Sequence, residues 1–106
     1  MIIRKWSCRA RHSKAHKYPE YFRTQIMPEL RKQKGFLGGF LSQRSSGDDT
    51  EFLVLTRWQS VDAVRAFAAP VLENVVIDTG ALATVDTYDD RVRQYEVLED
   101  IQPVES

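Results

Sequence analysis

Aromatic side chains are the residues of this 106-residue chain with the clearest chemical potential: it has two Trp, four Tyr and five Phe. Seven of them are candidates for the walls of a small-molecule pocket: Trp6, Tyr21, Phe22, Phe40, Trp58, Phe67 and Tyr95. The side chains that could hold an anionic oxygen such as a phenolate are Arg4, Thr56, Arg57 and Tyr95. A phenolate kept away from bulk water can pass an electron to O₂. The same aromatics could instead form the core and a subunit interface.

Arg4 has the most informative position among the polar residues. Because alternate residues of a strand share a face, Arg4 lies in line with Ile2, Trp6 and Cys8. An arginine on an apolar face is costly to bury unless it is paired or faces a polar cavity. Glu96 is one candidate partner. We therefore expect Arg4 to border a ligand pocket or to meet an acidic residue.

The two histidines and the single cysteine indicate neither a metal site nor a nucleophile. His12 and His16 are four residues apart, as metal-binding pairs on helices are, but the sequence suggests no third ligand. We expect both to be solvated, although His16 could act as a general base. Cys8 cannot form an internal disulfide and is expected to pack in the core, so a reducing cytoplasm is the expected location.

Formal charge divides between the two halves of the chain, although the net charge is zero. Residues 1–44 contain eleven Lys and Arg against two acids, giving +9; residues 45–106 contain four against thirteen, giving −9. The basic cluster Arg9, Arg11, Lys14 and Lys17 could hold a phosphate backbone, hold a carboxylate or simply be solvated. Because no nucleic-acid motif is present, we expect no nucleic-acid partner and interpret the halves as complementary.

The first half of the chain predicts a strand, a long helix and a second strand. The strands are expected at residues 1–10 and 36–45, where Gly38 and Gly39 mark a bulge or a close backbone approach. The helix is expected to begin at an N-cap, Ser13, and to end at Gly35, with Pro28 kinking or breaking its last turns. Its apolar stripe is Ala15, Tyr18, Phe22, Ile26 and Leu30.

The second half predicts strands at residues 51–58 and 92–98 with a helix capped by Ser60 and ended by Pro70 between them. Residues 71–90 are the least readable: a short helix or strand near 75–77, then a turn at Asp89 and Asp90. The order β-α-β-β-α-β predicts a ferredoxin-like α+β sandwich. We expect one domain over residues 1–98 and an acidic C-terminal tail over residues 99–106.

The central strands lack the alternation of a sheet with one exposed face. The run Phe52-Leu53-Val54-Leu55 is apolar throughout, whereas two helices can cover only one side of the sheet. We therefore expect a homodimer that forms through the second side of the sheet. No apolar run is long enough to cross a bilayer, and no signal peptide is recognisable, so no membrane partner is expected.

Six segments occur in an order typical of one protein family: residues 1–6, 18–22, 35–39, 51–60, 64–68 and 92–97. Together they resemble the antibiotic biosynthesis monooxygenase-like domains, which are dimeric α/β-barrel proteins, over roughly residues 1–98. The segments are signatures of a fold and not of catalysis. The resemblance implies a homodimer whose sheets pack together, with a pocket in each subunit between sheet and helices.

Chemistry varies within this family, since some members oxidise polyketide-like aromatics with O₂ and no metal or flavin, whereas others degrade haem. The haem-degrading branch relies on a first-strand Asn, a Trp in the second helix and a His after it. This chain has Ser7 or Cys8, Phe67 and no later histidine at the matching places. We therefore expect an oxygenase for an aromatic or quinol-like substrate, without metal or cofactor. The alternative is a non-catalytic ligand-binding or stress-response dimer.

Overall fold

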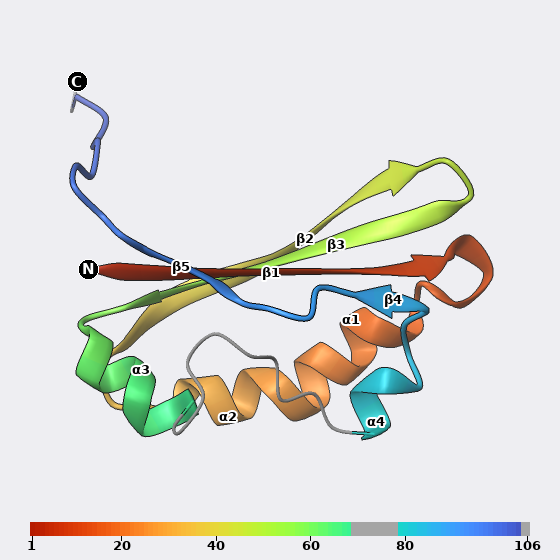
Figure 1. The fold of residues 1–106 in the computed structure, drawn as a ribbon, viewed down its shortest axis with the longest axis horizontal. Helices are drawn as coiled ribbons and strands as arrows, with labels where there is room; N and C mark the ends of the chain where they lie inside the picture. Colours follow the sequence, from red (N-terminus) through yellow and green to blue (C-terminus); the bar gives the residue numbers. More distant parts are fainter. Residues whose placement is uncertain (69–78, 105–106) are drawn as a thin grey trace.

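An antiparallel five-stranded sheet with helices on one side makes up the computed structural model, which describes residues 1–68 and 79–104 (Figure 1). The strands are β1 (Ile2–Arg11), β2 (Phe36–Ser46), β3 (Asp49–Trp58), β4 (Thr87–Tyr88) and β5 (Arg93–Glu96). Their order is β2-β3-β1-β4, and β5 also pairs with β1, so that β4 and β5 follow one another along one edge of β1. This topology confirms the predicted ferredoxin-like α+β fold.

The long helix of the first half consists of several short pieces. They are a 3₁₀ turn (η1, His12–Lys14), α1 (Lys17–Tyr21), a π-helical turn (η2, Phe22–Ile26) and α2 (Met27–Arg31). The predicted stripe faces the sheet, since Tyr18, Phe22 and Leu30 are buried. The predicted N-cap at Ser13 is wrong, because this residue lies in η1 and α1 begins after His16 without a side-chain cap. Pro28, which lacks an amide hydrogen, follows the π turn.

The hairpin of β2 and β3 shows both features that were predicted for its glycines. The pairing register shifts between Phe36 and Gly38, which is a β-bulge, and Gly38 has φ +130°. Gly39 approaches the neighbouring backbone so closely that an added Cβ would lie 2.4 Å from the carbonyl oxygen of Leu55. A side chain at Gly39 therefore cannot be accommodated without moving the strand.

The second helix, α3 (Val61–Ala68), begins as the sequence predicts. The amide of Ala63 donates to the Ser60 hydroxyl at 3.2 Å, which caps the helix. Val64 is fully buried under the sheet. The predicted end at Pro70 and the element near residues 75–77 lie outside the described residues, after which α4 (Thr79–Leu82) follows.

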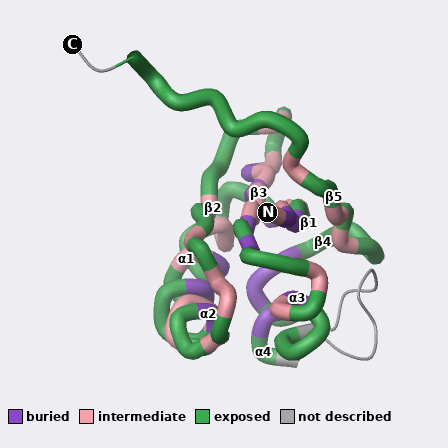
Figure 2. Tube along the Cα trace, turned by 90° about the vertical axis from the view of Figure 1, so that its left-hand side faces the viewer, coloured by how far each residue is buried: buried purple, intermediate pink, exposed green. Residues whose placement is uncertain are grey.

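The last predicted strand, at residues 92–98, corresponds to β5, and a short strand that was not predicted, β4, precedes it. β4 and β5 are separated by residues 89–92, where the Asp89 amide donates to the Ser7 carbonyl and the Asp89 carboxylate accepts from the Ser7 amide. The ladder ends where the Val97 amide donates to the Met1 carbonyl at 2.9 Å. Beyond this bond, residues 98–104 leave the body of the molecule and are exposed, as the green segment in Figure 2 shows.

The core lies between the sheet and the helices. Buried residues occur on one side of β1 and β3, on the inner sides of the helices, and near the end of α4 (Figure 2). On β1 the even-numbered residues face the helices and the odd-numbered ones face away, because Ile2, Cys8 and Ala10 belong to the core. The two sides of the sheet therefore offer two different environments for the candidate site residues.

Candidate functional site

Strand register divides the candidate residues between the two sides of the sheet. Arg4 pairs with Thr56, and Ile2 pairs with Trp58, so these residues and Trp6 share the helix-facing side. Tyr95 pairs with Ile3 and therefore lies on the open side, the side without helices. Arg57 also pairs with Ile3, from β3, and shares the open side. The structure thus brings Arg4 and Thr56 together and separates them from Tyr95 and Arg57.

One group of aromatic rings lies at the α1 end of the helix-facing side. Tyr18 is at its centre, with ring centroids 5.4 Å from Phe52, 6.1 Å from Trp6 and 6.2 Å from Phe22. Tyr88 of β4 extends the group, with its ring 6.3 Å from that of Trp6. The Trp6 indole donates to the Asp89 carbonyl at 2.8 Å, which fixes the ring. Burial raises the pKa of the Tyr18 phenol, so this group stays protonated.

A second aromatic group lies at the α3 end of the same side. Trp58 is fully buried, with its ring 5.3 Å from Phe36 and 5.1 Å from Phe67. The Trp58 indole donates to the Thr56 hydroxyl at 2.9 Å, so both polar atoms are satisfied. Phe67 is 41% exposed despite this contact, which places it at the rim of the layer.

Arg4 lies between the two aromatic groups. Its neighbours two residues away on β1 are Ile2, which pairs with Trp58, and Trp6. The side chain of Arg4 is buried, and its Nη1 donates to Oε1 of Gln94 at 3.2 Å. Gln94 pairs with Arg4 in the register of β1 and β5, whereas the predicted partner Glu96 pairs with Ile2. Glu96, which the sequence offered as one candidate partner, therefore forms no ion pair with Arg4, and Gln94 takes that place.

Three residues of this region are absent from the sequence-based set. Gln94 was missed because its role depends on the exact register of β5, which the sequence does not show. Tyr88 was missed because β4 is only two residues long. Tyr18 was recognised as a core residue of the helix, but its central place among the rings follows only from the packing of α1 on the sheet. Tyr21, which was predicted, is partly buried on α1.

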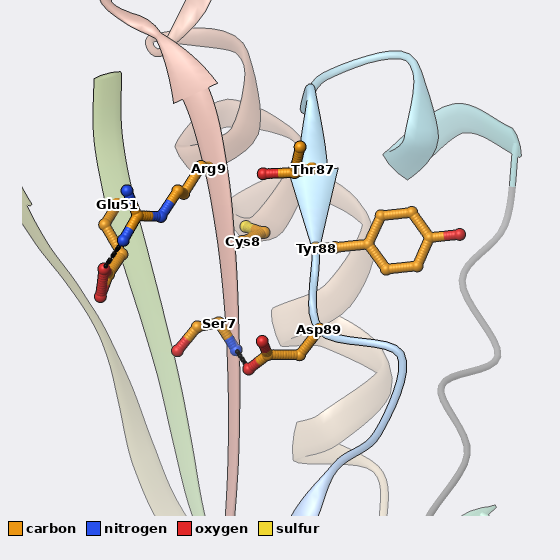
Figure 3. Close-up of a pocket in the computed structure, with 7 residues that line it drawn as sticks. All are labelled: Ser7, Cys8, Arg9, Glu51, Thr87, Tyr88 and Asp89. Carbon is orange, nitrogen blue, oxygen red and sulfur yellow. Dashed lines mark hydrogen bonds and ion pairs between the residues drawn. The ribbon is translucent and has the colours of Figure 1, made fainter. Parts of the chain in front are cut away.

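A small hollow of about 240 Å³ lies at the junction of β1, β3 and β4 (Figure 3). Its lining consists of Ser7, Cys8, Arg9, Glu51, Thr87, Tyr88 and Asp89. Burial, with a smaller contribution from the Asp89 charge, raises the pKa of the Cys8 thiol to about 12. Arg9 and Glu51 are already paired at 3.1 Å, and the Tyr88 ring points away from Ser7 and Asp89. The hollow therefore lacks a reactive nucleophile.

The histidines have structural surroundings. His12 is hydrogen-bonded through Nδ1 to the Thr50 hydroxyl at 2.9 Å and through Nε2 to the Gly47 carbonyl at 3.1 Å. These bonds hold the start of η1 against the β2–β3 turn. His16 is exposed just before α1. Within the described ranges, no three His, Cys, Asp or Glu side chains are grouped as they would be around a metal ion.

The family model described as Antibiotic biosynthesis monooxygenase matches residues 1–69, which is more than half of the chain. The chain therefore belongs to the antibiotic biosynthesis monooxygenase family. A search of curated protein sequences finds no match. None of the helices in the described part of the chain is long and apolar enough to cross a membrane.

Solved structures of similar fold span nearly the whole chain. One is a candidate antibiotic biosynthesis monooxygenase from Deinococcus radiodurans, with 21% identity, 99% of this chain and 100% of that chain covered, and a TM-score of 0.69. SnoaB, a cofactor-independent oxygenase from Streptomyces nogalater, has 16% identity, coverage of 96% and 98%, and a TM-score of 0.61. The haem degrader MhuD from Mycobacterium tuberculosis has 20% identity, coverage of 94% and 99%, and a TM-score of 0.57. At these identities the likeness shows the fold alone.

Proposed function

We propose that this protein is a small-molecule oxygenase that oxidises an aromatic or quinol-like substrate with O₂ between the sheet and the helices. The proposal needs no resident metal or organic cofactor, because an electron-rich phenolate or enolate can itself reduce O₂. Family membership supports an oxygenase in general, and the cofactor-independent activity of SnoaB supports this mode of reaction. The cytoplasm remains the proposed location, since the single buried Cys8 suits a reducing compartment.

The observation that carries the proposal is the pair of aromatic groups on the helix-facing side, with polar atoms between them. Trp6 and Val54 pair in the centre of this side, yet both are only partly buried. Ring walls that leave an accessible strip suit a flat aromatic substrate. Arg4 and Thr56 are buried beside Trp6 and Val54 on the same side, where a developing negative charge on the substrate could be stabilised.

For an anthrone-like substrate, the reaction balances without any further reductant. Loss of a proton gives the enolate, and the enolate passes electrons to O₂. The methylene carbon loses two hydrogens and gains one oxygen, while the second oxygen leaves as water. Each anthrone and O₂ therefore yield one quinone and one H₂O. The contribution of the protein would be to bind the anion, orient it and exclude bulk water.

Oxygen uptake with anthrone and a quinol panel tests this proposal. We expect uptake that is proportional to enzyme concentration and one quinone formed per O₂ consumed with anthrone. Trp6→Leu removes a ring wall and should lower kcat/KM by about 10–100-fold, whereas Trp6→Phe should retain most activity. Uptake no faster than in buffer would overturn the proposal. A protein that these compounds stabilise thermally but that consumes no O₂ would instead be the non-catalytic binder.

Haem degradation is not part of the proposal, although MhuD shares the fold. Two residues could match the first-strand Asn of the haem-degrading branch. Ser7 lies on the open side of the sheet, and Cys8 is a buried thiol. Phe67 stands where that branch has a Trp. We expect haem titration to give no specific Soret band, and a saturable one would contradict this expectation.

We infer further that a second copy of the chain covers the open side of the sheet. Its exposed apolar side chains include Phe40 (53%) and Tyr95 (48%). The partly buried Leu55 pairs with Phe40, Ile3 pairs with Tyr95, and Leu53 follows two residues before Leu55 on the same side. An apolar sheet face of this kind is typical of a subunit interface. Family members that pack sheet against sheet support the same arrangement.

Light scattering at micromolar concentration tests the homodimer. We expect twice the mass of the chain for the native protein and the monomer mass for Phe40→Asp, because a charge on the apolar face opposes burial. Gln25→Asp adds the same charge at an exposed position of η2 and should leave the dimer intact. A native protein of monomer mass would exclude the inferred assembly.

A further inference from the structure

Arg4 is a charged side chain in the core, and it forms no ion pair with an acidic residue in the described part of the chain. Only 7% of its surface is exposed, and burial lowers the pKa of its guanidinium. An arginine stays charged in proteins all the same, because its ordinary pKa is above 12. The ion pairs formed among the described residues do not include Arg4, and its polar contact is with the neutral amide of Gln94. Burying an unpaired charge costs folding free energy unless an anion pairs with it.

The remaining donors of Arg4 border accessible space. A guanidinium has five N–H donors, and the bond to Gln94 uses one of them. Among the described residues, no fully buried side-chain nitrogen or oxygen lacks a partner. The other Arg4 nitrogens therefore keep some accessible surface while the residue as a whole is buried. The strip between the two aromatic groups is where such donors can meet a ligand.

The acids on the two strands that pair with β1 beside Arg4, β3 and β5, do not fill this role. Glu96 is exposed and pairs with Ile2, and the Glu51 carboxylate is paired with Arg9 and Arg44. The acceptor beside Arg4 on β3, Thr56, already accepts a bond from the Trp58 indole. Among the described residues, the side chains beside Arg4 are thus neutral, paired with other groups or, in the case of Glu96, exposed.

We propose that Arg4 is an anion subsite that binds an ionised oxygen on an aromatic ligand, and that Gln94 is a positioning residue that orients the guanidinium. This inference rests on the proposed function for the aromatic part of the ligand and adds the requirement that the substrate carries a carboxylate or a phenolate. The flanking rings contact the aromatic face, and the guanidinium pairs with the anionic oxygen in a site of low polarity. A neutral analogue of the same shape leaves the Arg4 charge uncompensated.

Binding of matched anionic and neutral probes tests the subsite without reading oxidation. Isothermal titration at pH 7.5 compares 2-naphthoate with 2-naphthamide, and 4-nitrophenol with 4-nitroanisole, so that the two arms distinguish a carboxylate from a phenolate. We expect the anion of at least one pair to bind about 10- to 100-fold more tightly. Equal affinities within both pairs would overturn the proposal. Because no O₂ is consumed, an inactive protein that prefers the anion would refute the oxygenase and not the subsite.

Three variants assign the preference to its residues. Arg4→Met should reduce the preference for the anion to less than about twofold, whereas Arg23→Met, at an exposed arginine on the helix layer, should leave it unchanged. Gln94→Glu supplies a carboxylate beside Arg4. It should therefore raise the melting temperature of the protein and weaken the binding of 2-naphthoate about tenfold or more. A full preference in Arg4→Met, or tight naphthoate binding in Gln94→Glu, would show that the anion binds elsewhere. Gln94→Glu tests the subsite even if Arg4→Met fails to fold.

Discussion

Arg4 and Cys8 show how one side of one strand gives two titratable residues different roles. Both are on the helix-facing side of β1, and both are buried. Burial favours the neutral form of each, but the two groups differ in their ordinary pKa. The ordinary pKa of a thiol is only a little above neutral pH, whereas that of a guanidinium is far above it. At neutral pH the thiol is therefore uncharged and packs as an apolar group, while the guanidinium keeps its charge and needs an anion.

Cys8 should be unreactive while the protein is folded. The thiolate is the nucleophile, and the raised thiol pKa of about 12 leaves almost none of it at pH 8. We expect iodoacetamide at pH 8 to leave native Cys8 unmodified over a time in which the unfolded chain in guanidinium chloride is fully alkylated. Intact mass spectrometry measures both rates. Alkylation of the native protein at the rate of the unfolded chain would contradict the buried thiol.

At the residue scale, the sequence predicted correctly which face of a strand a residue occupies, because the alternation of a strand alone determines this. Alternation placed Arg4 beside Trp6 on an apolar face, and the structure agrees. The sequence could not show which β5 residue lies beside Arg4, because this depends on the pairing of strands far apart in the chain. Gln94 pairs with Arg4, whereas Glu96, two residues further along β5, pairs with Ile2. Register depends on the whole sheet, so no local pattern could have made this choice.

At the element scale, the approach of the loop between α2 and β2 to α3 depends on Gly35. This residue has φ +87°, and a Cβ added to it would lie 2.5 Å from the Cβ of Ala63 on α3. Its carbonyl also accepts from the Gln59 amide at 2.8 Å, just after β3. The predicted helix end at Gly35 is wrong, because α2 ends at Arg31. Gly35 lies in the loop that follows, where the chain passes close to α3.

Gly35→Ala should destabilise the protein more than Gly47→Ala. Both glycines have positive φ, but a Cβ at Gly47 (φ +60°) meets nothing within 4 Å. We expect a loss in the free energy of unfolding of about 1–2 kcal/mol at Gly47 and about 2–5 kcal/mol at Gly35, where crowding adds to backbone strain. Urea unfolding measures both. Adding Ala63→Gly should recover part of the Gly35→Ala loss, and equal losses in the two single variants would rule out the crowding.

Element boundaries were predictable where local chemistry sets them. Ser60 caps α3, and the Gly38–Gly39 pair makes a bulge, as the residue types indicate. Ser13 does not cap the first helix, because His12 is hydrogen-bonded to Thr50 and Gly47 and the chain continues through η1. That restraint comes from a hairpin more than thirty residues away, which no capping pattern contains.

At the scale of the whole molecule, the fold brings the basic first half and the acidic second half of the chain together. Basic and acidic halves interleave in the sheet, and ion pairs within the described part join them: Arg9–Glu51, Arg44–Glu51, Arg11–Asp86 and Lys14–Asp86, at 3.1–3.5 Å. This confirms the expectation of internal complementarity. The basic and acidic halves are therefore interleaved in one fold and do not form separate lobes.

The acidic tail should be dispensable for folding of the domain. Ile101 and Val104 are 91% and 96% exposed, and the last backbone bond to the sheet is at Val97. We expect a chain ending at residue 98 to melt within about 2–4 °C of the full chain, because little burial is lost. Differential scanning calorimetry measures the change. A much larger decrease would show that residues 99–106 belong to the folded domain or to its assembly.

Asp86 should make the folded chain sensitive to acid. Its carboxylate accepts from the Arg11 amide at 2.8 Å and pairs with Lys14 at 3.3 Å, and these contacts with the end of β1 hold its pKa below the usual range. A carboxylate with a lowered pKa adds stability above its ordinary pKa near 3.9, and that stability is lost as the pH falls through the folded value. Asp86→Asn should therefore have a lower urea midpoint than the native protein at pH 6, with the difference shrinking between about pH 4 and pH 2. High salt at pH 6 should reduce the same difference modestly, because these groups are partly exposed. A difference that stays constant from pH 6 to pH 2 would mean that Asp86 acts through its shape and hydrogen bonds and that its charge does not join the two halves.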